Sequence, residues 1–396
     1  LRENCGCCSP ARRRTTELRS DNGCFRFSGF PAADAAEIRR FRNEIFFMET
    51  DGKTLKPKNM ETIEWGALGF DYTKTDVNAR YSFTGGKWSD MEITADEYIR
   101  MHMSASCLHY GIELFEGLKA FRGVDGKVRL FRVEDNARRL QSSAKRLCLP
   151  VPTVEMVVEA CKEVVRRNER FIPPYGTGAS FYLRPVMFGT TVGLGVKPAK
   201  DALLIVYGSP VGAYFKTGIK PIMVAIDREQ DRAAPRGTGD VKVGGNYAAS
   251  LMSGEKAHDL GYSNVMYLDA AEHKYIEECG AANFFGIKDG KYITPKSPSV
   301  LPSITNMSLR QIARDMGLEV EERHIPVEEL ETFEECGACG TAAVISPIGK
   351  IFDMQTEKVY NYGTEVGKIS MELYTRLQDI QYGRAEDKHG WCTIVL

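Results

Sequence analysis

Two apolar runs, at residues 178–189 and 202–210, constrain the fold of this chain more than any other feature of its sequence. The second run, ALLIVYGSP, is nearly continuous in apolar residues, which is typical of a strand buried on both faces. A strand of that kind needs other secondary structure packed on each side of its sheet. The first run, GASFYLRPVMFG, is interpreted as a further strand.

Hairpin and helix patterns precede these runs. In LKAFRGVDGKVRLFR, Asp125-Gly126 separates two apolar arms, a pattern that predicts a two-residue hairpin. The segment VPTVEMVVEACKEVVRR is typical of an amphipathic helix. Its apolar face, at helical spacing, consists of Val154, Val157, Val158, Cys161, Val164 and Val165.

The second half of the chain mixes strands and helices in the same way. Residues 220–227 and 264–270 are interpreted as strands, and residues 283–295 as a hairpin turning at Asp289-Gly290. Helices are expected at 246–261, ending at Gly261, at 303–317, ending at Gly317, and at 366–383. Because strands and helices do not strictly alternate, the pattern favours an α+β or mixed α/β fold over a barrel or a doubly wound sheet.

The length of 396 residues, 43% of them hydrophobic, is sufficient for two domains. Pro210-Val211-Gly212 ends the second apolar run, and turn-rich sequence follows it. We therefore expect a smaller N-terminal α/β domain at residues 60–210, an interdomain loop at 211–220 and a larger C-terminal domain at 221–396.

Residues 1–59 differ from the rest of the chain. They contain Cys5, Cys7, Cys8 and Cys24 and show no sustained helical or strand period. The first methionines are Met48 and Met60, and ordinary aromatic-rich sequence begins after Met60. We expect these residues to be a disordered or non-native leader; a zinc site built on the cysteines and a transit peptide are the alternatives.

The charge balance excludes some partners. The chain has 52 lysines and arginines against 53 acidic residues, so no net field recruits nucleic acid or an anionic membrane surface. No apolar stretch approaches the roughly 20 residues of a membrane-spanning helix. The eleven cysteines are irregularly spaced, and several lie in apolar runs, as expected for free thiols. These features predict a cytoplasmic protein.

Lys242 is the candidate catalytic residue. It lies in GDVKVGGNYAAS, where Gly244 and Gly245 let a ligand approach the backbone and Tyr247 opens a predicted helix. A lysine in a loop is usually a solvated charge. A desolvated lysine, however, forms a Schiff base with an aldehyde, most commonly pyridoxal phosphate. That cofactor also needs a charge partner for its ring nitrogen, donors for its phosphate and an anion site for the substrate carboxylate.

Candidates for those groups occur elsewhere in the chain. A carboxylate for the ring nitrogen is available in Glu277 or Glu278. Phosphate donors are available at the start of a predicted helix, where free amides and the helix dipole favour anions. The candidates at this helix start are Ser303, Ile304 and Thr305. The alternatives in other segments are Gly340, Thr341, Arg138 and Arg139.

Eight segments together resemble the branched-chain amino acid aminotransferases, which are pyridoxal phosphate enzymes of the D-amino-acid-aminotransferase-like fold, fold type IV. The resemblance covers about residues 60–396. The segments are LHYGIELFEGLKAFRG, NARRLQSSAKRLCLP, SFYLRPVMFG, SPVGAYF, KVGGNYAAS, EECGAANFF, LPSIT and CGTAAVISP.

The resemblance implies that the domain at 221–396 binds the cofactor, and it implies a role for each residue around it. Lys242 would form the Schiff base and shuttle the proton at the substrate Cα. Glu278, the acid of the family's E-x-x-x-x-N-x-F pattern, would pair with the ring nitrogen, and Tyr247 would hydrogen-bond the 3′-oxygen. The phosphate would be held by Arg139, Ile304, Thr305 and Thr341.

The resemblance also implies a substrate site and no metal. The aromatic lining would accept leucine, isoleucine or valine, Arg184 would bind the side-chain carboxylate of glutamate, and the turn at Thr341-Ala342 would bind the α-carboxylate. Tyr110 would reach across from a partner subunit, so a homodimer is expected. The aromatic lining consists of Tyr110, Phe115, Tyr182 and Tyr214.

The implied activity is transfer of the amino group between leucine, isoleucine or valine and 2-oxoglutarate. A D-amino acid aminotransferase or an aminodeoxychorismate lyase of the same fold is the nearest alternative. A non-enzymatic nucleotide-binding module is the alternative from another class. The chain has no G-x-x-x-x-G-K-[ST] pattern to support that last interpretation.

Overall fold

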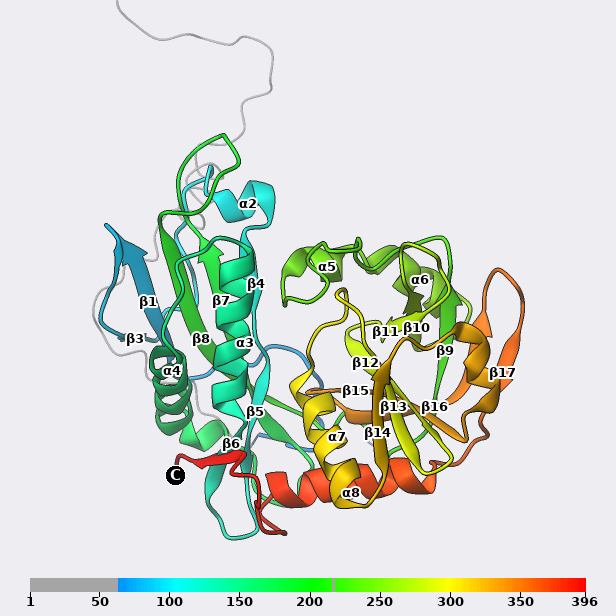
Figure 1. Ribbon diagram of the computed structural model, residues 1–396. Coiled ribbons are helices and arrows are strands. Elements are labelled where there is room, and N and C mark those ends of the chain that lie inside the picture. Colours follow the sequence, from blue (N-terminus) through cyan, green and yellow to red (C-terminus); the bar gives the residue numbers. More distant parts are fainter. Residues whose placement is uncertain (1–62, 216–217) are drawn as a thin grey trace, which may run out of the picture. The chain divides into compact units, whose positions relative to one another are not determined.

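A computed structural model describes residues 63–215 and 218–396 of the chain (Figure 1). The predicted leader at residues 1–59, with its zinc and transit-peptide alternatives, lies outside the described residues. Two sheets, each of nine strands, organise the described part. Of its helices, none combines the length and apolar character that a bilayer crossing requires.

The first sheet has the strand order β18-β6-β5-β7-β8-β1-β2, with β3 paired to β1 and β4 paired to β7. Its long central pair, β7 and β8, is antiparallel over ten residue pairs, from Ser180↔Val211 to Gly189↔Ala202. The hairpin expected at Asp125-Gly126 forms through the antiparallel pairing of β5 with β6. Its turn is not the predicted two residues, because the Gly123 amide donates to the Lys127 carbonyl and leaves a three-residue turn at 124–126. The strands are β1 (Asn78–Thr84), β2 (Lys87–Trp88), β3 (Glu92–Thr94), β4 (Glu113–Phe115), β5 (Leu118–Arg122), β6 (Val128–Phe131), β7 (Ser180–Gly189), β8 (Ala202–Val211) and β18 (Cys392–Ile394).

Helices α3 (Val133–Arg146) and α4 (Val154–Arg167) cover this sheet. The valines predicted to form one face of α4 are buried at Val157, Val164 and Val165, in one core with strand residues such as Leu183. The side chain of Thr153 caps α4 by accepting from the Met156 amide. The remaining short helices of this part are α2 (Ser106–Tyr110) and the 3-10 turn η1 (Glu169–Phe171).

The second sheet has the order β11-β10-β9-β16-β15-β12-β13-β14, with β17 paired to β16. Strand β11 also pairs with β12, so six of its strands form a closed ring, a closure that the sequence pattern does not predict. Its strands are β9 (Ile222–Asp227), β10 (Asn264–Leu268), β11 (Ile276–Cys279), β12 (Ala282–Lys288), β13 (Lys291–Pro295), β14 (Glu319–Arg323), β15 (Glu335–Gly340), β16 (Val344–Asp353) and β17 (Val359–Asn361).

Helices α7 (Ile304–Asp315) and α8 (Lys368–Gln381) pack against β15 of this sheet, while α6 (Leu251–Asp259) packs on β9 and β10. The 3-10 turn η2 (Val327–Thr332) follows β14. Gly261 and Gly317 adopt positive φ angles of 82° and 84° directly after α6 and α7, as expected for residues that end helices.

The prediction of a single helix at 246–261 is wrong in one respect. The segment forms α5 (Gly244–Ala248) and then α6, with a break between them. The Ser250 hydroxyl donates to the Tyr247 carbonyl over 2.7 Å at the break. A serine that bonds to nearby backbone in this way competes with a continuous helix.

Strand β18, near the end of the chain, pairs with β6 of the first sheet. The two sheets therefore do not divide the chain into two uninterrupted sequence ranges. The domain boundary at residues 211–220 stays a prediction. Three connections position the candidate site: the loop from β9 to α5, the loop from β13 to α7, and the turn from β15 to β16.

Candidate functional site

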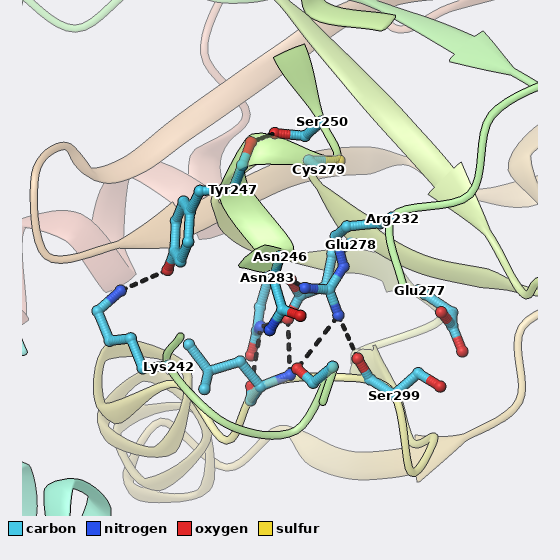
Figure 2. A network of polar contacts seen from close by, with 12 residues as sticks. Arg232, Lys242, Asn246, Tyr247, Ser250, Glu277, Glu278, Cys279, Asn283 and Ser299 are labelled. Atoms are coloured by element: carbon cyan, nitrogen blue, oxygen red, sulfur yellow. Dashed lines mark hydrogen bonds and ion pairs between the residues drawn. The ribbon is translucent and has the colours of Figure 1, made fainter. Parts of the chain in front are cut away.

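Lys242 lies in the loop between β9 and α5, and its backbone is fixed by two other elements. Its amide donates to the Ser143 hydroxyl of α3 over 3.1 Å, and its carbonyl accepts from the Phe115 amide of β4 over 3.1 Å. The Lys242 Nζ lies 2.5 Å from the Tyr247 hydroxyl (Figure 2). It also lies 4.4 Å from the centre of the Phe115 ring. The sequence-predicted lysine and tyrosine are therefore in direct contact.

Gly244, beside this loop, is in close contact with a side chain of the protein. Its amide donates to Glu113 Oε1 over 2.7 Å, and a Cβ at this position would lie 1.9 Å from the same oxygen. No such restriction applies to Gly245, where an added Cβ would have no atom within 4 Å among the described residues. The close approach expected for a ligand at Gly244 is thus made by a carboxylate of the chain itself.

Burial sets the protonation of this lysine. Desolvation, followed by the positive charge of Arg139, lowers the pKa of Lys242 to about 7. Desolvation and the nearby Glu278 carboxylate raise the pKa of Tyr247. A lysine amine with such a pKa is available as a neutral nucleophile near pH 7, as the chemistry predicted for Lys242 requires.

The two candidate carboxylates of β11 have different surroundings. Glu277 accepts from the Ser297 hydroxyl over 2.5 Å, and Figure 2 shows it directed away from Lys242. Both carboxylates are 3% exposed, but it is the charge of Glu278 that interacts with that of Lys242. These surroundings favour Glu278, which the family pattern also selects.

Arg139 lies beside the start of α7. Its Nη1 donates to the Pro302 carbonyl over 3.1 Å, two residues before Ile304. The neighbouring Arg138 is largely exposed and pairs with Glu134 instead. Ile304, Thr305 and Thr341, three of the residues predicted to bind the phosphate, line one small cavity, and Arg139 is not among its lining residues.

Several predicted substrate residues cluster around Arg184. The Arg184 guanidinium lies 4.7 Å from the centre of the Phe115 ring, and its Nη2 donates to the Tyr182 hydroxyl over 3.0 Å. Tyr214 and Ala342 line a separate cavity of about 300 Å³. Arg184 also lines a cavity of about 370 Å³ with residues of β1 and β8.

Tyr110 is the remaining predicted site residue. It is 39% exposed on α2, and its hydroxyl donates to the Leu194 carbonyl of the same chain. The role predicted for Tyr110 involves a second subunit, and it stays a prediction.

Three buried charged residues touch the predicted site residues but were not singled out by sequence. Glu116 accepts from Arg139 Nε and Nη2 over 2.8 and 2.7 Å. The Lys119 Nζ donates to the Ala342 carbonyl over 2.7 Å, and burial lowers the pKa of Lys119 to about 8. Arg232 pairs with Glu278. A charged residue inside an apolar strand, as in LFEGLKAF, is the sequence signal for the first two.

Comparisons with known proteins show the family of this chain. A family profile described as amino-transferase class IV matches residues 113–351. The branched-chain-amino-acid aminotransferase of Haemophilus influenzae is 47% identical over 339 residues, covering 84% of this chain and 98% of that protein. An Arabidopsis thaliana branched-chain-amino-acid aminotransferase described as chloroplastic is 42% identical over 83% of this chain and 79% of that protein.

Solved structures of branched-chain amino acid aminotransferases share the fold. The Escherichia coli structure has a TM-score of 0.68 at 30% identity and covers 80% of this chain and 100% of its own. The Thermoproteus uzoniensis structure with norvaline has a TM-score of 0.65 at 26% identity and covers 80% and 100%. Further solved structures of such enzymes hold pyridoxamine 5′-phosphate, N-(5′-phosphopyridoxyl)-L-glutamate or 4-methylvaleric acid. The expected mixed α/β fold is confirmed, and the chain belongs to the branched-chain amino acid aminotransferases of the class IV aminotransferase family.

Proposed function

We propose that this chain exchanges the amino group between a branched-chain L-amino acid (leucine, isoleucine or valine) and 2-oxoglutarate, with pyridoxal phosphate as its cofactor. One observation carries the proposal: in a chain of this family, a partly buried lysine with a pKa of about 7 lies 2.5 Å from the hydroxyl of Tyr247. A lysine held in this way serves covalent chemistry with an aldehyde better than it serves protein stability.

The donor set of the site fits pyridoxal phosphate. It combines the Lys242 amine, the buried Glu278 carboxylate and the start of a twelve-residue helix beside Arg139. When bound, the cofactor supplies an aldehyde that takes up the amino group and a protonated ring that accepts the electron pair left at the substrate Cα.

Each residue of the cofactor site has a separate task. Lys242 binds the cofactor covalently and, once the substrate displaces it, takes and returns the proton at the substrate Cα. Glu278 keeps the ring nitrogen protonated, and Tyr247 donates to the 3′-oxygen. The phosphate is held by the Arg139 side chain, the Thr341 hydroxyl and the amides of Ile304 and Thr305.

The substrate residues handle two unlike side chains. Phe115, Tyr182 and Tyr214 offer apolar ring surface to an aliphatic side chain, whose burial contributes roughly 25 cal/mol per Å². Arg184, stacked near Phe115, binds the side-chain carboxylate of glutamate. The amides of the Thr341-Ala342 turn bind the α-carboxylate, which is common to all these substrates.

A homodimer is part of the proposal, because the family resemblance implies that Tyr110 reaches a partner subunit, and its side chain is 39% exposed. In a dimer, Tyr110 of one subunit completes the substrate site of the other. The cytoplasm remains the predicted compartment, on the basis of the irregularly spaced cysteines.

The test uses a panel of amino donors with 2-oxoglutarate as acceptor. We expect L-leucine, L-isoleucine and L-valine to yield glutamate and D-alanine to yield none. The Lys242→Ala variant should lose activity by a factor on the order of 10²–10⁴, because both the amine and the proton carrier are removed. Borohydride reduction followed by peptide mapping should label the parent protein at Lys242 alone.

The exposed Lys127 provides a matched control, and Lys127→Ala should keep the parental rate and the parental label. Activity with D-alanine but not with the branched-chain L-amino acids would instead identify a D-amino acid aminotransferase. A Lys242→Ala protein with parental turnover would remove Lys242 from the reaction.

A further inference from the structure

Arg232 is a buried arginine with no role in the site as described so far. It lies in the loop between β9 and Lys242 and is 6% exposed. Figure 2 shows its guanidinium in the polar network that contains Glu278 and Ser299. A buried guanidinium is costly unless its charge is paired, so its partners indicate what it does.

The guanidinium joins three segments that are far apart in the sequence. Its Nη1 lies 3.2 Å from Oε2 of Glu278 on β11. Its Nη2 donates over 3.3 Å to the Gly239 carbonyl in the Lys242 loop, and also to the Ser299 carbonyl in the loop before α7. One side chain therefore ties the Glu278 strand to the loops that carry the predicted lysine and the predicted phosphate site.

Glu278 is held on both oxygens. While Oε2 faces Arg232, Oε1 accepts from the Leu301 amide over 2.8 Å and from the Asn283 side-chain amide over 2.9 Å. All three donors favour the ionised carboxylate. Arg232 is the one of the three that carries a charge.

The two loops meet closely at the point that Arg232 binds. A Cβ on Gly239 would lie 2.3 Å from the Ser299 carbonyl oxygen. Only glycine allows this approach of the two backbones, because any side chain would push them apart. The contact indicates that the loops are packed to a fixed distance.

Charge decides whether Glu278 is ionised. Burial raises the pKa of Glu278 to about 7, although Arg232, the Leu301 amide and Lys242 act in the opposite direction. Without Arg232 the carboxyl group would be neutral over a wider pH range. The charged groups that shift the pKa of Glu278 are Arg232, Lys242 and Glu277. Glu278 in turn shifts the pKa values of Arg139, Tyr247, Cys279 and Cys339.

We propose that Arg232 is a positioning residue of the ring-nitrogen site: it keeps Glu278 ionised and clamps that carboxylate to the Lys242 loop and to the loop before α7. The inference rests on the proposed role of Glu278. Stability alone does not account for Arg232, because a buried ion pair contributes little compared with apolar packing. Within residues 63–215 and 218–396 its Nε also has no hydrogen-bond partner.

The experiment measures the protonation of the cofactor ring directly. The full chain is loaded with ¹⁵N-ring-labelled pyridoxal phosphate, and the ring-nitrogen chemical shift is followed from about pH 6 to about pH 9. The affinity for the cofactor is measured by equilibrium dialysis. The variants are Arg232→Gln, Arg232→Lys, Glu278→Gln and, as a matched control, Arg228→Gln.

Arg228 is a suitable control because it makes the same kinds of contact with other partners. It pairs with Asp353 over 2.8 Å and donates to the His273 carbonyl over 3.0 Å. We expect Arg228→Gln to keep the parental nitrogen shift. Arg232→Gln should move the shift to that of an unprotonated ring in the upper part of the pH range.

Arg232→Lys separates charge from geometry. It keeps the charge but cannot bind three segments at once, so we expect a protonated ring together with cofactor affinity lowered ~10–100-fold. If Arg232→Gln does not fold, the Arg232→Lys result decides: parental affinity in that variant contradicts the clamp, and an unprotonated ring in it contradicts the charge argument.

The outcomes also separate this inference from the proposed function. If Glu278→Gln leaves the ring protonated, Glu278 is not the partner of the ring nitrogen, and the proposed role of Glu278 fails. If Glu278→Gln removes the proton while Arg232→Gln keeps the parental shift and affinity, the role of Glu278 stands and the inference about Arg232 is wrong.

Discussion

At the scale of the residue, burial changes the chemistry of groups that are ordinary in sequence. Desolvation lowers the pKa of Lys242 to about 7 and raises the pKa of Glu278 to about 7. Such pairs of shifted groups are typical of sites that move protons.

The lowered pKa of Lys242 predicts how the stability of the cofactor-free protein depends on pH. The folded protein loses the lysine proton near pH 7, whereas the unfolded chain keeps it until about pH 10.5, so the unfolded state binds more protons in between. The free energy of unfolding should therefore rise across this window, by up to ~1.4 kcal/mol per pH unit from this group.

The measurement is urea unfolding of the cofactor-free protein at several pH values between about 7.5 and about 9.5. Lys242→Met should show a smaller rise in unfolding free energy than the parent, and the exposed Lys127→Met should match the parent. An equal slope in the parent and in Lys242→Met would contradict the lowered pKa.

At the scale of the element, helix α7 joins stability to the site. The Ser303 hydroxyl caps it by accepting from the Asn306 amide over 3.2 Å. The Asn306 side chain in turn donates to Asn283 over 3.0 Å, and Asn283 donates to Glu278 over 2.9 Å. The first turn of α7 thus connects the predicted phosphate site with the predicted ring-nitrogen partner.

Removal of this cap should affect both folding and cofactor binding. Ser303→Ala should lower the free energy of unfolding by about 1 kcal/mol. If the first turn must then be ordered when the phosphate binds, the affinity for pyridoxal phosphate should fall by a similar free energy, roughly fivefold.

Thr153 gives a matched control, because it caps α4 by accepting from the Met156 amide over the same 3.2 Å. Thr153→Ala should cost similar stability and leave the cofactor affinity at the parental value. Urea unfolding and equilibrium dialysis check both variants. Parental affinity in both would show that the first turn of α7 does not depend on its cap for phosphate binding.

At the scale of the whole molecule, a group of exposed apolar side chains surrounds α2. This apolar patch comes from α2, the segment just before it and the loop after β7. A bridge between Ala105 and Val192 holds the two segments together. Exposed apolar groups of this kind mark association surfaces more often than free surface. The patch consists of Met103, Leu108, Val192, Leu194 and Val196, which are 83%, 60%, 56%, 86% and 75% exposed.

The proposed homodimer predicts that charge in the apolar patch separates the subunits. The double variant Leu194→Asp, Val196→Asp should sediment as a monomer in analytical ultracentrifugation, whereas the parent sediments as a dimer. In the proposed dimer, Tyr110 of one subunit completes the substrate site of the other, and its hydroxyl binds the Leu194 carbonyl in the patch. Separation of the subunits should therefore also lower kcat/KM, by a factor on the order of 10².

Val124 is 55% exposed in the β5–β6 turn, and Val124→Asp is the corresponding control outside the patch. It should keep the parental mass and rate. A monomeric parent protein with full activity would contradict the dimer and the role of Tyr110 together.

Local patterns predicted much of the fold. The hairpins at Asp125-Gly126 and Asp289-Gly290 are present, because a short turn and its flanking strands are encoded within about fifteen neighbouring residues, but only the second has a two-residue turn. The helices expected at 303–317 and 366–383 are present for the same reason. The closure of the second sheet through β11 and β12 was not predictable, since strand pairing around a ring depends on contacts between distant segments.

The candidate site was predictable in its residue types but not in its supporting contacts. The spacing of the family pattern selected Glu278 over Glu277, and the surroundings of the two carboxylates agree with that choice. Glu116 and Arg232 were missed, because each acts through a partner at least 20 residues away in the chain. No local period marks such a pair.

The sequence by itself determined most of the strands and helices, and its motifs predict which side chains take part in the chemistry of this family. Both depend on neighbouring residues and short motifs. Only the tertiary structure decided that Lys242 and Glu278 are desolvated, that Arg232 pairs with Glu278, and that the Gly244 amide donates to Glu113. The physical reason is that desolvation and charge pairing depend on distances in space between segments far apart in the sequence.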